Sequence, residues 1–151
     1  MWHGWLVHPL REKDVRAYLE VREILELKAL GLARPRLVRS DLETMLEGNP
    51  LPKAGQPARL DNHVHQYLVD KSQNRYLRDF FRQYIARYYT MLFDYAAPEA
   101  SVVAEMARQH RQILRALIRR DWPRARKSLS DHIRSQGAVL TRLLSVSKEG
   151  V

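Results

Sequence analysis

The chain has 151 residues, a size suited to one domain, and its composition of 45% apolar and 28% charged residues is typical of a globular protein rather than a disordered one. No apolar run approaches the roughly 18–20 residues that span a bilayer, and residues 1–10 do not have the basic start and apolar centre of a signal peptide. We therefore expect a cytoplasmic protein with no membrane partner. Cysteine is absent, so a metal would be held by histidine, carboxylate and water, which suit a hard or borderline divalent ion.

The net charge of +9 raises the question of a polyanionic partner. The 26 lysines and arginines are spread along several predicted helices and form no dense basic block. This distribution favours solvated helix faces with a general attraction to acidic partners, rather than a nucleic-acid site.

The N-terminal half begins with a short strand-like piece, MWHGWLVHP, which has no partner strand in the sequence. Residues 11–33 then predict a long amphipathic helix, and Arg22 lies within its apolar stripe. An arginine there is either a snorkelling or ion-paired structural residue, or a ligand-binding one. The residues of this stripe recur at helical spacing: Val15, Tyr18, Leu19, Arg22, Leu25, Ala29 and Leu32.

A short helix follows, for which Ser40 as N-cap and Glu43 three residues later suggest a capping box. The segment GNPLPKAGQPAR, residues 48–59, carries three prolines and two glycines and predicts a loop.

The next predicted helix, residues 58–71, carries Asp61 and His65 four residues apart, so both side chains lie on one face. That face also holds the apolar residues Leu60, Val64 and Leu68, which points the carboxylate and the imidazole inward. Inward ionisable groups are costly unless they are paired or bind a metal. A following helix, residues 75–95, predicts an aromatic wall for the core, made by Leu77, Phe80, Phe81, Tyr84, Ile85, Tyr88, Met91 and Leu92.

Two further helices are predicted at residues 98–120 and 121–144. His110 lies on the apolar face of the first, and His132 lies beside Ile133 on that of the second. His110 is eleven residues before Asp121 and His132 eleven after it, so an antiparallel hairpin that turns there places both imidazoles at the same height.

A lone histidine on an apolar stripe is usually a core residue, but three of them with an aspartate predict a metal site. We expect Asp61, His65, His110 and His132 to be the ligands of a divalent ion, with zinc first and nickel, manganese or iron as alternatives. The other histidines are excluded because two precede the bundle and the third, next to His65, lies on another face: His3, His8 and His63.

These residues resemble the effector-binding domain of GntR-superfamily transcription regulators, of the FCD type named for the C-terminal domain of FadR. The resemblance rests on Glu20-Val21-Arg22 followed by Glu26, on Asp61 and His65 followed by SQNRYL, on HRQILRAL from His110, and on ARKSLSDHI ending beside His132, and it covers about residues 5–146. It implies an all-α, antiparallel bundle of about six helices, a metal held by the four residues above, and a homodimer.

The domain organisation expected from the resemblance is a remnant of a wing strand and linker at residues 1–10, an FCD-like domain at 11–146 and a tail at 147–151. The winged-helix domain through which such regulators bind DNA is not recognised in the sequence, and the segment before Asp61 is shorter and richer in proline than is usual in the family.

The expected function is that of a sensor rather than an enzyme. A small organic acid would complete the metal's coordination, and Arg22 would bind a second carboxylate, with Asn74 and Arg87 as weaker candidates. DNA binding would be controlled through the winged-helix domain. Two alternatives remain at this point: a metal-dependent hydrolase on a helical bundle, and a purely structural metal in a closed tetrahedral site.

Overall fold

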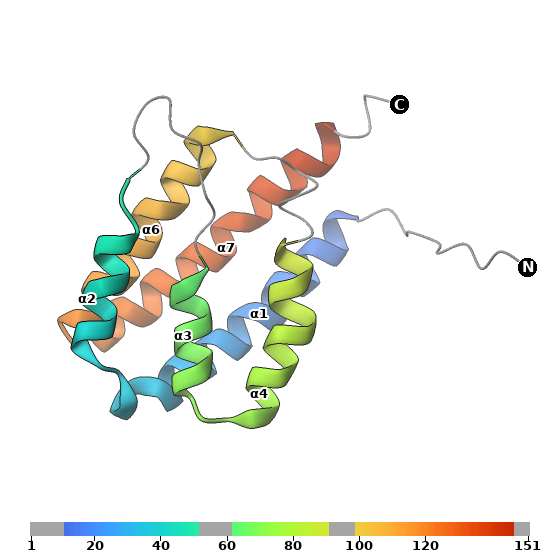
Figure 1. The fold of residues 1–151 in the computed structure, drawn as a ribbon. Helices are drawn as coiled ribbons and strands as arrows, with labels where there is room; N and C mark the ends of the chain where they lie inside the picture. The colour runs from blue at the N-terminus through green and yellow to red at the C-terminus, as the bar shows by residue number, and fades with distance from the viewer. Residues whose placement is uncertain (1–10, 52–61, 91–98, 147–151) are drawn as a thin grey trace, which may run out of the picture.

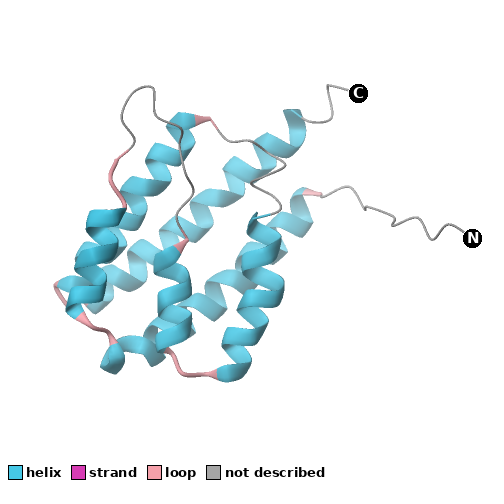
Figure 2. Ribbon diagram, viewed as in Figure 1, coloured by secondary structure: helices cyan, strands magenta, loops and turns pink. Residues whose placement is uncertain are grey.

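The protein is described by a computed structural model for residues 11–51, 62–90 and 99–146. These residues form six α-helices and no strand, so the predicted all-α fold of about six helices is confirmed (Figures 1 and 2). Among the described helices, none is both long and apolar enough to cross a membrane. In chain order the elements are α1 (Glu12–Ala33), the 3-10 turn η1 (Arg34–Arg36), α2 (Arg39–Gly48), α3 (His63–Lys71), α4 (Arg75–Phe80), the π-helix η2 (Phe81–Ala86), α6 (Ala100–Ile118) and α7 (Trp122–Val146).

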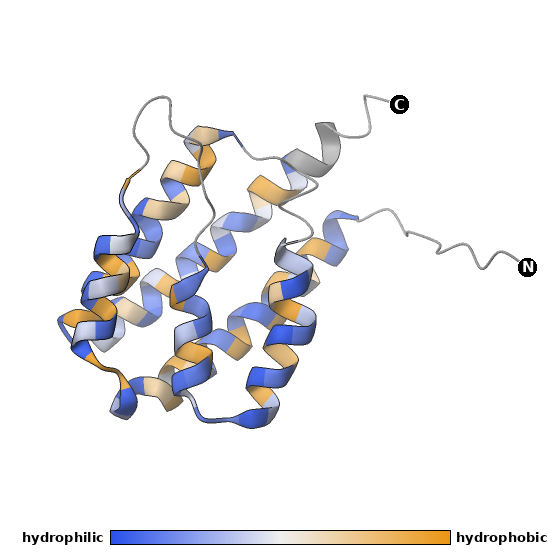
Figure 3. Ribbon diagram, viewed as in Figure 1, coloured by the Kyte–Doolittle hydropathy of each residue, from blue (hydrophilic) through white to orange (hydrophobic). Residues whose placement is uncertain are grey.

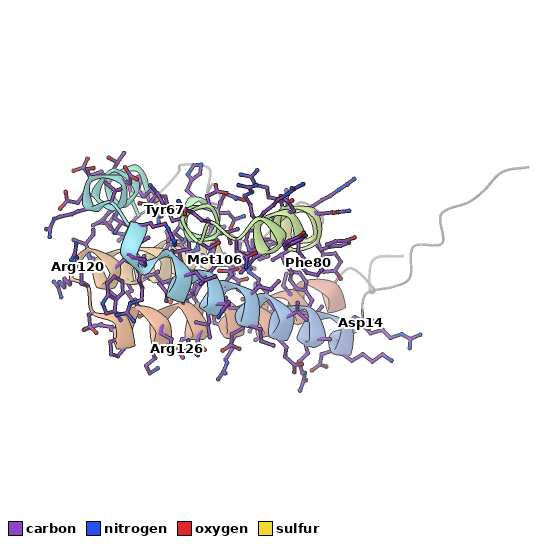
Figure 4. All side chains as sticks on the ribbon, turned by 90° about the horizontal axis from the view of Figure 1, so that it is seen from below. Asp14, Tyr67, Phe80, Met106, Arg120 and Arg126 are labelled. Carbon is purple, nitrogen blue, oxygen red and sulfur yellow. The ribbon has the colours of Figure 1, made fainter. Side chains whose placement is uncertain are left out.

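The helices pack in two layers, which Figure 4 shows edge-on. One layer contains α7 between α1 and α6, and the other contains α2, α3 and α4 (Figure 1). Helix α2 packs on α6, and α3 packs on α1. Apolar residues alternate with polar ones along each helix (Figure 3), and the core between the layers is built from the apolar faces. Its largest fully buried apolar side chains are Leu68, Ile113, Leu114, Leu117, Leu129, Ile133 and Leu140.

The α6–α7 hairpin turns where the sequence predicts, because both helix ends are capped there. Arg120 takes the left-handed conformation with φ 57°, and its N–H and that of Asp121 donate to the carbonyls of Leu117 and Ala116, closing a Schellman motif. The Asp121 carboxylate then accepts a 3.1 Å hydrogen bond from the backbone N–H of Arg124 in the first turn of α7. The hairpin fixes the height at which residues on α6 and α7 face each other.

The predicted capping box at Ser40 is wrong. Helix α2 begins at Arg39, and Val38 takes the N-cap position with an extended backbone and no side-chain cap. The backbone N–H of Val38 donates instead to the Tyr67 hydroxyl of α3 at 3.0 Å, so a tertiary contact takes the place of the local cap.

Two residues of the predicted aromatic wall are also exposed, Phe80 at 42% and Tyr84 at 53%. The reason is the π-helix η2, which has more than four residues per turn. Side chains four residues apart therefore stay on one face of this segment and point into the core. The buried residues accordingly follow that spacing: Leu77, Phe81, Ile85 and Tyr89. Met91 and Leu92 lie outside the described residues, as do the predicted wing-strand remnant and the C-terminal tail.

Candidate metal centre

Three histidines from three helices meet in the core. His65 of α3, His110 of α6 and His132 of α7 are 1%, 4% and 1% exposed. The Nε2 atom of His65 lies 3.1 Å from that of His110 and 3.2 Å from that of His132, and the Nε2 atoms of His110 and His132 are 3.1 Å apart. Among the residues that the structure describes, they form a cluster able to offer three ligand atoms to one ion. His63 is exposed and lies on another face of α3.

In His65 and His132 the outer ring nitrogen, Nδ1, makes a hydrogen bond that determines the tautomer of the ring. The tautomer in turn determines whether Nε2, which faces the other histidines, carries a free lone pair. His65 Nδ1 contacts the Glu26 carboxylate, so in the neutral ring Nδ1 donates and Nε2 presents its lone pair inward. His132 Nδ1 donates to the amide oxygen of Gln109 at 2.8 Å and leaves its Nε2 in the same state. Partners that hold the outer nitrogen of a histidine are the usual support of a metal ligand.

The spacing of the three nitrogens fits a bound ion. Nitrogens held about 2.1 Å from one metal lie about 3.0 Å apart at right angles and about 3.4 Å apart at tetrahedral angles. The observed separations of 3.1 to 3.2 Å fall between these limits. Three nitrogens on one side of an ion leave its other side for further ligands.

A buried ion pair flanks the histidines. Arg22 Nε donates to Glu26 at 2.6 Å, and the two side chains are 2% and 1% exposed. Burial opposes the ionisation of Glu26, but Arg22 and His65 outweigh it and lower the pKa of Glu26 to about 2. Burial, together with the neighbouring His65, lowers the pKa of His110 well below its usual value. Burial also lowers the pKa of His132, so neutral rings, the form that binds metals, are favoured.

Arg22 is held on three sides. Besides Glu26, its guanidinium donates to the Gln136 amide oxygen at 2.7 Å and lies 4.4 Å from the centre of the Tyr89 ring. The Gln136 amide nitrogen in turn lies 2.8 Å from His132 Nε2. Arg22 is therefore an ion-paired core residue that is connected to the histidine cluster through two side chains, Glu26, which contacts His65, and Gln136, which contacts His132.

The other predicted site residues are not brought to the cluster. Asp61 lies outside the described residues, so its place in the site remains a prediction. Asn74 is exposed and caps α4, where its side chain accepts a 3.0 Å hydrogen bond from the backbone N–H of Leu77. Arg87 is exposed.

Sequence reasoning missed Glu26, Gln109 and Gln136 as parts of this site. Glu26 follows Arg22 by four residues and Gln136 follows His132 by four, so each lies one turn further along the same inward face. That spacing was an available signal for both. Gln109 carries none, because it adjoins His110 in sequence and reaches His132 only through the packing of α6 on α7.

The comparisons with known proteins agree with this architecture. A family model, the FCD domain, matches residues 17–135, which is more than half of the chain. A search of curated proteins and a search of solved structures each returned no match. The matched range includes all three clustered histidines, the Arg22–Glu26 pair and Gln109. The chain therefore belongs to the FCD family, the C-terminal effector-binding domains of GntR-family regulators.

Proposed function

We propose that this domain senses a small organic acid through a divalent metal ion held by His65, His110 and His132, with Asp61 as a fourth ligand. The observation that carries the proposal is the convergence of three buried Nε2 atoms at separations that fit one ion. When bound, the ion would supply a Lewis-acidic centre with positions free for a carboxylate. Zinc is our first choice of ion, with nickel, manganese or iron as alternatives.

Arg22 supports the choice of an acid as the ligand. Its guanidinium is a fixed, buried positive charge, and a single Gln136 side chain separates it from His132. A carboxylate that bridges the ion and Arg22 would receive both coordination and a charge-assisted hydrogen bond. Asn74 and Arg87, which are exposed, are the weaker candidates for such a contact.

The contacts of the Glu26 carboxylate argue against a metal-dependent hydrolase. A metal-dependent hydrolase needs a general base free to take a proton from a bound water. Among the described residues, Glu26 is the carboxylate in contact with the cluster, and its two oxygens are engaged by Arg22 and His65. The Glu26 carboxylate therefore holds Arg22 and His65 in position and is not free to act as a general base.

Membership of the FCD family makes the chain a regulatory effector domain. We infer that it acts as a homodimer in the cytoplasm and controls DNA binding by a winged-helix domain joined to its N-terminus. For the acid to act as a signal, it must bind one arrangement of the domains better than another, and the difference in affinity sets the change in DNA binding.

The test is the metal dependence of acid binding. Lactate, citrate and a sugar acid are titrated into zinc-loaded and metal-free protein, and calorimetry and the melting temperature are recorded. An acid that binds the native state raises the melting temperature through RT ln(1 + [L]/Kd), and we expect this rise only with the ion present. Equal acid affinity in the metal-free protein would mean that the ion is structural and the effector site lies elsewhere.

A further inference from the structure

Gln136 occupies an unusual position between the ion pair and the histidine cluster. It is 1% exposed and lies on α7, one turn after His132. Its amide oxygen accepts a hydrogen bond from Arg22 at 2.7 Å, which directs its amide nitrogen to His132 Nε2 at 2.8 Å. An amide nitrogen can only donate, so His132 Nε2 is the acceptor.

The lone pair that receives this hydrogen bond is the one that a metal ion would need. His132 Nδ1 already donates to Gln109 on the opposite side of the ring, so Nε2 carries the only lone pair of the neutral imidazole. The two glutamines thus act on one ring in opposite senses. Gln109 fixes the tautomer that binds metal, and Gln136 occupies the nitrogen that would coordinate it.

We propose that Gln136 competes with the ion for His132 Nε2, so that metal binding releases its amide and metal affinity is set below what the histidines alone would give. This inference rests on the proposed metal site. Once released, the Gln136 N–H is a buried donor that has lost its acceptor, and a carboxylate bound at the ion and Arg22 is the group that would satisfy it. Gln136 therefore favours the state in which metal and acid are bound together over the state with metal alone.

The experiment measures zinc affinity, without any acid, by competition with a chromophoric chelator. Gln136→Met removes the competing N–H at similar volume, and we expect zinc to bind about tenfold more tightly, which corresponds to one lost hydrogen bond of a buried donor. Gln136→Ala removes the same donor and leaves room for water beside Arg22, so it should give the same direction if the methionine variant folds poorly. Both variants also lose the hydrogen bond between Gln136 and Arg22. Because this bond is missing in the zinc-bound and in the zinc-free variant alike, its loss cancels in the zinc affinity.

Gln109→Met is the matched control, because it changes the other glutamine of the same ring. It removes the acceptor that orients His132, so zinc should bind about tenfold more weakly. Opposite signs for the two glutamines support the proposal. Unchanged or weaker zinc binding by both Gln136 variants would overturn it while the metal site stands, whereas a wild-type protein that binds no zinc would refute the proposed function itself.

Discussion

Replacing Glu26 by glutamine tests how the buried ion pair supports the site. Glu26 accepts from Arg22 Nε at 2.6 Å and contacts His65 Nδ1. A glutamine of the same shape has one acceptor and one donor where the glutamate has two acceptors. If its oxygen stays on Arg22, its N–H faces His65 and forces the proton of that ring onto Nε2, where the lone pair for a metal is lost.

The cost to folding follows from the burial of the pair. The pKa of Glu26 is about 2 against an ordinary 4.5, a difference worth about 3 kcal/mol at neutral pH. Breaking a buried pair by removing one charge costs about 3–5 kcal/mol, which is the same scale. Zinc affinity should fall by about 10- to 100-fold, as for other supporting partners of a metal ligand.

Glu43→Gln is the matched control, because Arg39 and Glu43 form the same Nε to Oε1 contact at the same spacing of four residues, at 2.8 Å, with side chains 70% and 46% exposed. We expect a change below about 1 kcal/mol there and no change in zinc affinity. Urea unfolding of the metal-free proteins and zinc competition measure both quantities. Equal unfolding free energies for the two variants would refute the argument from burial.

Three further outcomes are expected. The pKa values of His110 and His132 are lowered in the folded protein, so the unfolded chain binds more protons below about pH 6.5. The free energy of unfolding of the metal-free protein should therefore decrease as the pH is lowered through that range, which melting curves at several pH values can measure. Ile113→Ala in the core should cost about 2–5 kcal/mol and Ile24→Ala, at a site 68% exposed, less than about 0.5, by urea titration. DNA binding by this chain should be non-specific and lost by about 0.2 M salt in a filter assay, and sequence-specific retention would contradict the effector-domain account.

The sequence was sufficient for the helices whose apolar residues recur at 3.6-residue spacing. Helices α6 and α7 and their turn at Asp121 were predictable because periodicity and capping agree there. The same pattern brought His110 and His132 to one height. Spacing failed at Phe80 and Tyr84, because a π-helix changes the period without a sequence signal that we recognised.

The candidate site was predictable only in part for a similar reason. Helical periodicity shows which side chains point inward, and it identified the three histidines and Arg22. It does not show which inward groups of different helices bond to one another. The contacts of Glu26 with His65 and of Gln109 with His132 depend on the packing of helix pairs, which a single helix pattern does not contain.

The most direct test of the metal site is the metal content of protein purified without added metal or chelator. Elemental analysis should find about one divalent ion per chain. His132→Ala should lower metal affinity by well over about tenfold, because it removes one of three converging nitrogens, whereas His63→Ala, on the exposed face of α3, should leave it unchanged. A protein that is metal-free, cannot be loaded, and melts at the same temperature with and without chelator would contradict the account.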